Sequence, residues 1–469
     1  MSGRPLTILL GVLLTTQLAV ARPLGAPAAE INAALDALSR PLRDPADLTP
    51  LIDAAGAARA VLLGESTHGT REFGSWRDLL SRRLIAERGF SFVAIEGDRS
   101  SLAPLDRYVR GMPGAASSAC AALQRIERWP RWAWVNPELA RFGEWLRDFN
   151  RGRPFNRRIG VYGIDLHALW DSADAVEAFY ARHLTQLAAH VAQRYASLQR
   201  FRDRYQGYAD HVRATGGSAR IGAAEVAADL SQRYAGAPAR EREMLFEVLL
   251  HAVVVAAGER FLCQLTWPPW YAWNTRAVHF DDMLARLLAH HGARGRGIVW
   301  AHNSHIGDAR ATLDPTRPNE ISFGELARMH LGAGRVFSIG FGTALGSVRA
   351  AREWEGPDEV MRLQRPRADS IEAALLDSGG GDRFMVFDPP SPVAQALGRV
   401  IPQRAIGVVY EPHDEARKHY VPARLSARYD AFVFVPLSHA SEPLPRACAD
   451  GRVRSSVSPA PPGTSSRSP

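Results

Sequence analysis

The chain has 469 residues, of which 46% are hydrophobic and 23% are charged, and its formal net charge at pH 7 is +8. This composition is typical of a globular protein and excludes a collagen, a coiled coil and a largely disordered chain. The 57 basic residues are arginines except for Lys418, and they are scattered singly among 49 acidic residues. A nucleic-acid-binding protein gathers its positive charge in a stripe, so we expect no nucleic-acid partner.

The first predicted element is a targeting segment. Arg4 precedes an apolar run from Leu6 to Val20, which closes on the small-x-small sequence Ala19-Val20-Ala21. This layout is typical of a secretory signal peptide, and the run is short for a membrane span. We therefore predict a signal peptide over residues 1–21 and a secreted or periplasmic mature protein without a stable membrane span. An uncleaved N-terminal anchor is the alternative.

Short apolar runs recur along the next part of the chain, and each is followed by a helical stretch. Runs that are apolar throughout are typical of strands buried on both faces of a sheet. Their alternation with helices predicts an α/β fold with a central, mostly parallel sheet flanked by helices, over residues 22–437. The predicted strands are residues 60–63, 92–95, 159–162, 297–300, 336–339, 384–387, 405–409 and 432–435.

Two parts of the chain depart from this alternation. Residues 171–262 contain no strand candidate and show apolar residues at helical spacing, which predicts a helical insertion. From residue 438 the chain becomes rich in Ser and Pro, which predicts a disordered tail over residues 438–469.

The chain has three widely spaced cysteines, Cys120, Cys263 and Cys448. An odd count without close spacing fits neither a disulfide framework nor a zinc motif. One pair can form, and Cys120 with Cys448 is conceivable, but the spacing does not select it. Cys263 lies in an apolar run and is expected to be a buried filler.

Acidic and histidine side chains follow four of the predicted strands, at the point where each strand ends. In an open α/β sheet, ligands bind outside the carboxyl ends of the strands, so we expect these side chains to form one site. They are Glu65 and His68 in the segment GESTHGT, Glu96 in EGDR, Asp165 and His167 in GIDLH, and His302 and His305 in AHNSH.

Three chemistries fit these side chains. Ser66 lies in the nearest match to a nucleophile-elbow motif, but His68 occupies the place of the last small residue. A divalent metal is the second, with Glu65, His68, Glu96, His302 and His305 as ligands. In the third, a neutral histidine takes a proton from water while a carboxylate orients it and a second histidine or Arg77 stabilises the oxyanion.

Several of these segments resemble the erythromycin esterase family. The resemblance rests on GESTHGTREF at 64–73, FVAIEGD ending at 98, YGIDLH at 162–167, VWAHNSHIGD at 299–308 and RAIGVVYEP at 404–412. These segments span most of residues 55–437 in the expected order. The family also includes proteins named for succinoglycan biosynthesis, so the resemblance is less specific to a substrate.

The resemblance implies an α/β core with a helical lid and cleavage of a carboxylic ester or macrolide lactone without a metal or other cofactor. The family's general base falls on His68, and its supporting glutamates on Glu65 and Glu96. Its helix arginine falls on Arg77, and its late histidines on His302 and His305. We expect His302 and Arg77 to stabilise the oxyanion, with His305 as support. The expected partner is a small-molecule ester or macrolide substrate.

Further polar and aromatic residues are predicted to line the cleft. Rigid aromatic walls suit a bulky, apolar substrate. The predicted substrate-binding residues are His305, Asp165, Asn303, Trp132, Trp134, Trp270, Tyr271, Asn274 and Arg276. A position in the hydrophobic core is the alternative for each of the aromatic residues.

Two other functions use the same residues. One is a divalent-metal-dependent hydrolase built on the Glu and His cluster. The other is a periplasmic binding or polysaccharide-assembly protein without macrolide turnover, although binding alone does not require a general base.

Overall fold

The structure is a computed structural model, and it describes residues 27–388, 391–445 and 448. Its strands are β1 (Arg40–Pro41), β2 (Ala60–Leu63), β3 (Phe92–Asp98), β4 (Gly160–Asp165), β5 (Gly297–Trp300), β6 (Val336–Ala351), β7 (Asp358–Arg362), β8 (Arg383–Val386), β9 (Val400–Arg404), β10 (Tyr420–Arg424) and β11 (Ala431–Ser438).

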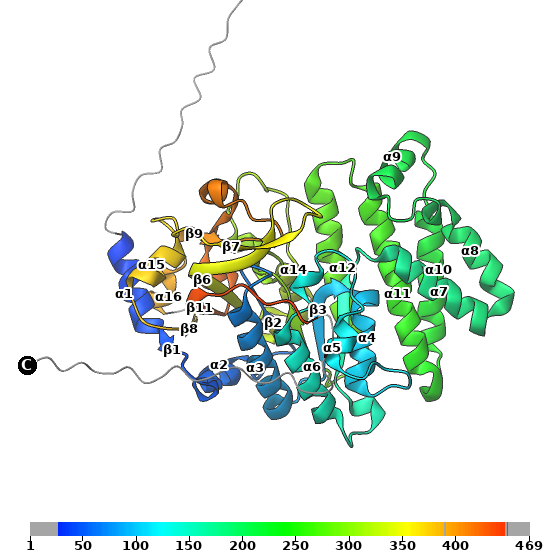
Figure 1. The fold of residues 1–469 in the computed structure, drawn as a ribbon, viewed down its shortest axis with the longest axis horizontal. Helices are drawn as coiled ribbons and strands as arrows, with labels where there is room; N and C mark the ends of the chain where they lie inside the picture. Colours follow the sequence, from blue (N-terminus) through cyan, green and yellow to red (C-terminus); the bar gives the residue numbers. More distant parts are fainter. Residues whose placement is uncertain (1–26, 389–390, 446–447, 449–469) are drawn as a thin grey trace, which may run out of the picture.

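The centre of the molecule is one nine-stranded sheet (Figure 1). Its order is β1-β8-β11-β6-β2-β5-β3-β4, and β7 pairs with β6 outside this row. The six strands from β11 to β4 run parallel, whereas β8, β1 and β7 are antiparallel to the neighbours they pair with. The predicted α/β fold with a central, mostly parallel sheet is therefore confirmed.

Helices cover both faces of this sheet. The N-terminal half contributes α1 (Pro27–Leu38), α2 (Thr49–Ala55), α3 (Arg71–Arg88), α4 (Arg99–Arg110), α5 (Ala119–Leu123), α6 (Pro137–Asn150), α7 (Leu169–His183), α8 (Thr185–Gln199), α9 (Tyr205–Thr215) and α10 (Arg220–Ala235). The C-terminal half contributes α11 (Ala239–Cys263), α12 (Pro269–His290), α13 (Asn303–Ile306), α14 (Phe323–Leu331), α15 (Ile371–Asp377), α16 (Pro392–Ala396), α17 (Glu415–Lys418) and α18 (Leu425–Arg428).

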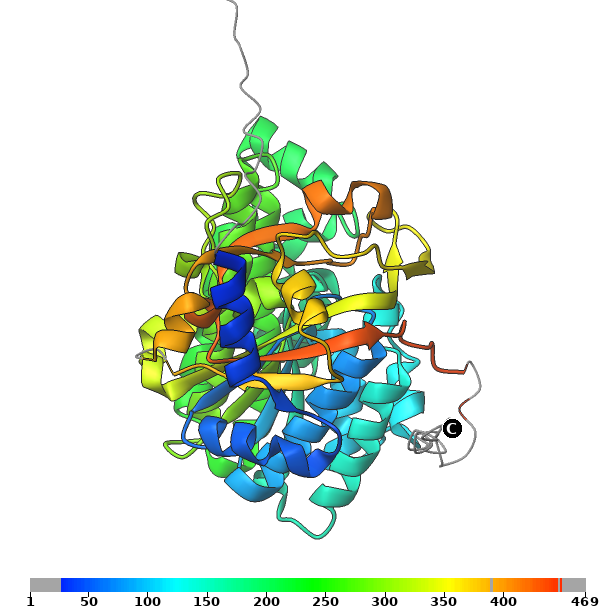
Figure 2. The same ribbon diagram turned by 90° about the vertical axis from the view of Figure 1, so that its left-hand side faces the viewer.

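The buried side chains divide into two cores, one on each face of the sheet. Along β2, Ala60 and Leu62 point into one core while Val61 and Leu63 point into the other. Helices α2 to α6 pack over the second core, and α1, α7, α11, α12 and α14 pack over the first. Figure 2 shows the two helix layers on either side of the strands: the blue and cyan helices α2 to α6 on one side, and the green helices together with the dark blue α1 on the other.

The predicted helical insertion corresponds to α7 to α11, with no strand between them in a stretch that the structure describes without a gap. These helices extend the molecule beyond the β4 edge of the sheet (Figure 1).

One predicted strand is wrong. Residues 405–409 form a loop, and only Val409 forms an isolated bridge, with Ala351. The strand lies just before it, as β9, and pairs with β10 in a separate two-stranded sheet. The apolar run failed as a predictor because the loop's Ile406 N–H donates to the Ser66 carbonyl at 2.7 Å instead of to a neighbouring strand.

The predicted tail over 438–469 is wrong in its first residues. Ala440 bridges to Thr70, the Ser441 N–H donates to the Gly69 carbonyl, and Leu444 is buried. Cys448 forms a disulfide with Cys120. These contacts hold the chain against α3 and α5 in spite of its polar composition. Residues 446–447 and 449–469 lie outside the described residues.

The predicted signal peptide, residues 1–21, also lies outside the described residues. Among the helices that are described, none combines the length and the apolar character that a membrane span requires. Cys263, the remaining cysteine, is half-buried, and its Sγ contacts the carboxylate of Glu259 at 3.2 Å.

Candidate active site

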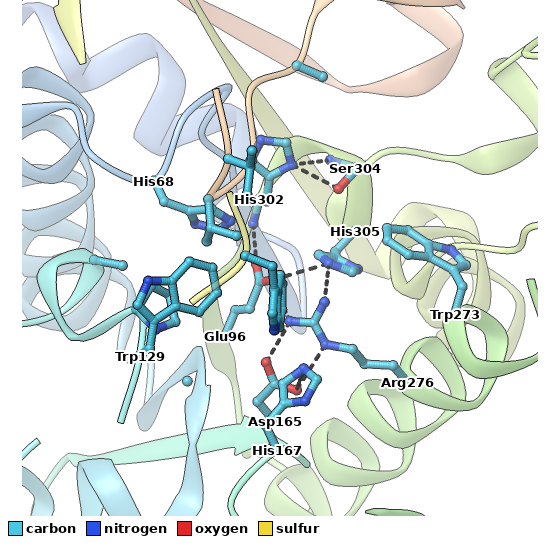
Figure 3. Close-up of a pocket in the computed structure, with 18 of the residues that line it drawn as sticks. His68, Glu96, Trp129, Asp165, His167, Trp273, Arg276, His302, Ser304 and His305 are labelled. Atoms are coloured by element: carbon cyan, nitrogen blue, oxygen red, sulfur yellow. Dashed lines mark hydrogen bonds and ion pairs between the residues drawn. The ribbon is translucent and has the colours of Figure 1, made fainter. Parts of the chain in front are cut away.

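The polar side chains that follow β2, β5, β3 and β4 meet at one edge of the sheet. These four strands are adjacent and parallel, so their carboxyl ends lie side by side. They border a cavity of about 770 Å³ (Figure 3). The polar residues that line it include His68, Glu96, Asp98, Asp165, His167, Arg276, His302, Ser304 and His305.

Gly64 allows two of these strand ends to approach each other. A Cβ atom at Gly64 would lie 2.1 Å from Asn303 Oδ1. Asn303 is held on the backbone of Phe341, donating to its carbonyl at 2.6 Å and accepting its N–H at 3.1 Å. Asn303 was expected to bind substrate, but its side chain instead ties the loop after β5 to β6 and does not line the cavity.

His68 and Glu65 form a hydrogen-bonded pair at the end of β2. His68 Nδ1 lies 2.9 Å from Glu65 Oε1. Because a carboxylate accepts, Nδ1 carries the proton and Nε2 keeps its lone pair. Nε2 forms no hydrogen bond with any described residue, and the ring lines the cavity. This is the tautomer that a general base requires.

The environment of His68 favours its protonated form. Burial lowers the pKa of His68, but the hydrogen bond to Glu65 and the charges of Glu65 and Glu96 outweigh it, so the pKa is raised above 6.5. Glu65 remains ionised, because the Arg77 charge overcomes the effect of burial and lowers its pKa.

Arg77 lies behind Glu65. Its Nη2 is 2.7 Å from Glu65 Oε2, and its guanidinium lies over the ring of Trp300, 5.1 Å from the centroid. Arg77 does not line the large cavity. Arg77 therefore does not have the position that its predicted role in oxyanion stabilisation requires. Instead it pairs with the carboxylate of Glu65, which orients His68.

Arg276, from α12, connects three side chains of the cavity. Its Nε and Nη2 donate to the two Asp165 oxygens at 2.9 and 2.6 Å, and Nη2 also donates to Glu96 Oε1 at 2.7 Å. Burial acts to raise the pKa of each carboxylate, but Arg276, together with His305 at Glu96, lowers both. Both carboxylates are thus ionised at neutral pH, although each is almost completely buried.

His302 is neutral and has a defined tautomer. Its Nδ1 accepts the backbone N–H of Ser304 at 3.2 Å, so the proton is on Nε2, which faces the Ile406 carbonyl at 3.2 Å. Burial and the neighbouring His68 lower its pKa to about 3. Its own backbone N–H donates to Glu96 Oε2 at 2.7 Å. The His302 and His68 rings are 5.0 Å apart between centroids, which places a fixed N–H donor beside the candidate base.

His305 has a supporting position. Its Nε2 lies 2.9 Å from Arg276 Nη1 and 3.2 Å from Glu96 Oε1, and the ring stacks on Trp273 with centroids 4.6 Å apart. Burial lowers its pKa, so the ring is neutral. Its Nδ1 has no hydrogen-bond partner among the described residues.

The buried carboxylates and arginines around His68 do not balance in charge. Glu65, Glu96 and Asp165 are negative, and Arg77 and Arg276 are positive. One negative charge is in excess while His68 is neutral, and protonation of His68 compensates it. The cluster is therefore arranged to accept a proton on His68.

In the metal-binding alternative, the carboxylate oxygens would bind a metal ion, but in the structure they are paired with arginines. Glu65 is paired with Arg77, and both Glu96 and Asp165 with Arg276. No group of three or more metal-binding side chains is arranged as a metal site in residues 27–388, 391–445 and 448.

The predicted aromatic residues divide between the cavity and other places. Trp134 lines the cavity, with its ring edge towards His68. Trp132 is buried in the core instead, and Trp270 and Tyr271 stack on each other outside the cavity. Asn274 is bound to backbone atoms of Asn319 and Ile321. The helical spacing of 267–274 did not indicate which face of α12 points inward, and this was the source of the error.

Several cavity residues were not among the predicted binding residues. Trp129 and Trp273 lie on opposite sides of the polar cluster (Figure 3), and the loop 405–409 and Tyr420 come from distant parts of the chain. Asp98 follows the same strand as Glu96, which is the signal that could have found it, whereas His167 was expected in the site and does line the cavity. Burial and the Asp165 charge raise the pKa of Asp98 to about 7.

The helical insertion does not line this cavity. It lines an adjoining hollow of about 1400 Å³, which shares Arg128, Trp129, His167 and Trp354 with the cavity. From the insertion, Asp171, residues 203–207 and Phe261 border that hollow. A lid role for the insertion stays a prediction.

Comparisons with known proteins bear on this site. A family model described as erythromycin esterase matches residues 85–438. The matched range contains Glu96, Asp165, Arg276, His302 and His305, and it begins after Glu65, His68 and Arg77.

Solved structures share the fold at low sequence identity. A succinoglycan biosynthesis protein is 20% identical, with a TM-score of 0.73 over 88% of this chain and 98% of that one. A protein from Bacillus cereus is 18% identical, with a TM-score of 0.71 over 89% and 99%. A mutant of the erythromycin esterase EreC in its open conformation is 15% identical, with a TM-score of 0.61 over 85% and 95%.

Proposed function

The chain belongs to the erythromycin esterase family, and on that ground we propose that it is an enzyme that hydrolyses a carboxylic ester or a macrolide lactone. The observation that carries the chemistry is the His68–Glu65 pair. It leaves the His68 Nε2 lone pair free at a cavity of about 770 Å³, a size suited to a small-molecule substrate.

The first step is proton abstraction from water. A water molecule donates to His68 Nε2, and its oxygen attacks the ester carbonyl while Nε2 takes the proton. The imidazolium that forms is stabilised by Glu65, which receives its Nδ1–H, and by the negative charge of Glu96. In the second step the tetrahedral intermediate expels the alcohol, and the imidazolium returns its proton to the leaving oxygen.

The oxyanion is stabilised by groups beside the base. His302 is neutral, and its Nε2–H faces the Ile406 carbonyl. We assign this N–H as the donor that leaves the Ile406 carbonyl and binds the oxyanion when it forms. Arg276 supplies the positive charge. Glu96 is a positioning residue, because it binds both the His302 backbone N–H and the Arg276 guanidinium. His305 supports Arg276, and Trp134, Trp129 and Trp273 bound the substrate.

Ser66 has no part in this mechanism. It is completely buried, its Oγ has no hydrogen-bond partner among the described residues, and it does not line the cavity. Metal chemistry is the second candidate, and the pairing of each carboxylate with an arginine favours the reaction without a metal.

We further propose that the protein is exported. The predicted signal peptide is the main support, and the Cys120–Cys448 disulfide fits an oxidising compartment such as the periplasm or the extracellular space.

The function is tested by product analysis. The purified protein is incubated with a 14-membered macrolide and with a panel of simple esters, with and without EDTA, and the products are followed by mass. We expect a substrate that gains one water in the presence of EDTA. Loss of activity with EDTA and its return with a divalent metal would establish the metal-dependent alternative, and binding without turnover would establish a binding protein.

The pH dependence of the reaction follows from the raised pKa of His68. The base is neutral His68, so kcat/KM falls as the pH drops through its pKa, and we expect this acid limb above pH 6.5. His302 adds no ionisation near it, because its pKa is about 3. A pH profile of kcat/KM measures the limb.

Asp98 provides the matched control for this profile, because its own pKa is about 7. Asp98→Asn keeps the oxygen that accepts the Ala168 N–H and removes the second ionisation. The acid limb should remain in that variant. A limb that disappears with Asp98→Asn would assign it to Asp98 and not to His68.

A further inference from the structure

A further hollow, separate from the two already described, lies on α12. It is a groove of about 600 Å³ formed by α10, α11 and α12, which Figure 1 shows side by side in green. Its floor consists of small apolar side chains: Ala224, Ala227 and Ala228 on α10, and Val253, Ala256 and Ala257 on α11. Such a surface accommodates an apolar chain.

His279 is the most deeply buried of the polar side chains that line this groove. It is 2% exposed, it lines the groove, and neither of its ring nitrogens has a hydrogen-bond partner among the described residues. Burial lowers its pKa to about 4, so the ring is neutral at pH 7 and offers one N–H and one lone pair. Buried polar atoms without a partner are costly, which indicates a ligand that supplies one.

Two arginines stand at one end of the groove. Arg220 and Arg260 are exposed, and neither forms a hydrogen bond or an ion pair within the described part of the chain. Helices α10 and α11 pack against each other and are joined by a short connection, so the start of α10, with Arg220, lies beside the end of α11, with Arg260. A third arginine, Arg286, is paired with Asp282 at 2.9 Å. The free positive charge is therefore concentrated at the Arg220 and Arg260 end.

The spacing along α12 relates this end to His279. Tyr271 and Asn274 line the groove near the start of α12, which follows α11 after a short connection and so lies close to Arg260. His279 lies five to eight residues further along α12, which is about 8–12 Å at the rise of an α-helix.

We propose that this groove is a second ligand site, distinct from the catalytic cavity, for a carboxylate with a short apolar body and a polar group at its far end. The carboxylate is bound by Arg220 and Arg260, the apolar body covers the alanines, and the far polar group hydrogen-bonds to His279. Asp282 at the opposite end disfavours a second negative charge there. The site does not depend on the proposed hydrolase activity.

Calorimetric titration of the full-length protein tests the site. The probes are 8-hydroxyoctanoate, whose length matches the spacing, octanoate, which lacks the far hydroxyl, and octanol, which lacks the charge. We expect saturable binding of 8-hydroxyoctanoate, weaker binding of octanoate and weaker binding still of octanol. In the double variant Arg220→Gln/Arg260→Gln, affinity for 8-hydroxyoctanoate should fall at least about tenfold.

Two further variants complete the test. His279→Leu should abolish the preference for 8-hydroxyoctanoate over octanoate, whereas Arg182→Gln, an exposed arginine on α7 away from the groove, should change nothing. Equal affinity in the wild-type protein and the arginine double variant would overturn the proposal. So would the absence of saturable binding, octanol binding as tight as octanoate, or a preference that survives His279→Leu.

Discussion

Replacement of His68 by alanine is expected to lower kcat at least about 10³-fold, because it removes the group that takes the proton from water. The His68 ring is the one side chain of the cluster that combines a free Nε2 with an Nδ1–H held by a carboxylate. The Glu65–Arg77 pair remains intact in the variant, so the fold should survive. Turnover of the substrate found in the ester and macrolide panel measures the effect, and thermal unfolding verifies the fold.

The matched control for His68→Ala is Ser66→Ala, two residues away on the same loop. The Ser66 hydroxyl is buried and has no hydrogen-bond partner in the part of the chain that the structure describes, so its removal should leave most of the activity. If instead Ser66→Ala were inactive and His68→Ala retained turnover, the nucleophile would be the serine and the reaction would pass through an acyl-enzyme.

Glu65→Gln is expected to lower kcat by about 10³–10⁴-fold, although the substituted side chain is nearly the same size. The carboxylate accepts the Nδ1–H of His68 and so keeps the lone pair on Nε2. A glutamine amide can donate to Nδ1 instead, which stabilises the tautomer with the proton on Nε2 and leaves no base at the cavity. Loss of the Glu65 charge also removes the effect that raises the pKa of His68. The residual activity should therefore have its acid limb at lower pH.

A second variant separates this effect from instability. Glu65→Gln alone leaves Arg77 buried and unpaired, and breaking a buried ion pair in this way costs roughly 3–5 kcal/mol of folding free energy. The double variant Glu65→Gln/Arg77→Met removes both charges and should recover much of the stability while turnover stays low. Recovery of turnover together with stability would show that Glu65 acts only through the fold.

The sheet could be predicted from the sequence because its strands are buried on both faces and their apolar runs are continuous. Such a run does not reveal where the backbone hydrogen bonds go. Residues 405–409 are as apolar as a strand, but the Ile406 N–H binds the Ser66 carbonyl, and the segment becomes a wall of the cavity. The polar residues at 439–444 bind to α3 and to the loop before it, and composition gave no sign of these contacts.

The polar part of the site was predictable because parallel strands bring their carboxyl ends to one edge. Glu96, Asp165 and His302 were placed by that rule. The rule did not place side chains that come from helices, because small differences in helix rotation decide which face points inward. Arg276 and Trp273 point into the cavity, whereas Asn274 and Tyr271 on the same turn of α12 point elsewhere. Arg77 lies near the cavity but behind Glu65, and only the packing of α3 reveals this.

The proposal that water, and not a side chain, attacks the ester is tested most directly by intact-protein mass spectrometry. The enzyme is mixed with excess substrate in ¹⁸O-labelled water and quenched with acid during turnover. Direct attack by water activated on His68 predicts a carboxylic acid product that carries the label and a protein of unchanged mass at every quench time. A protein whose mass has increased by that of the acyl group, formed and lost at the rate of turnover, would contradict it.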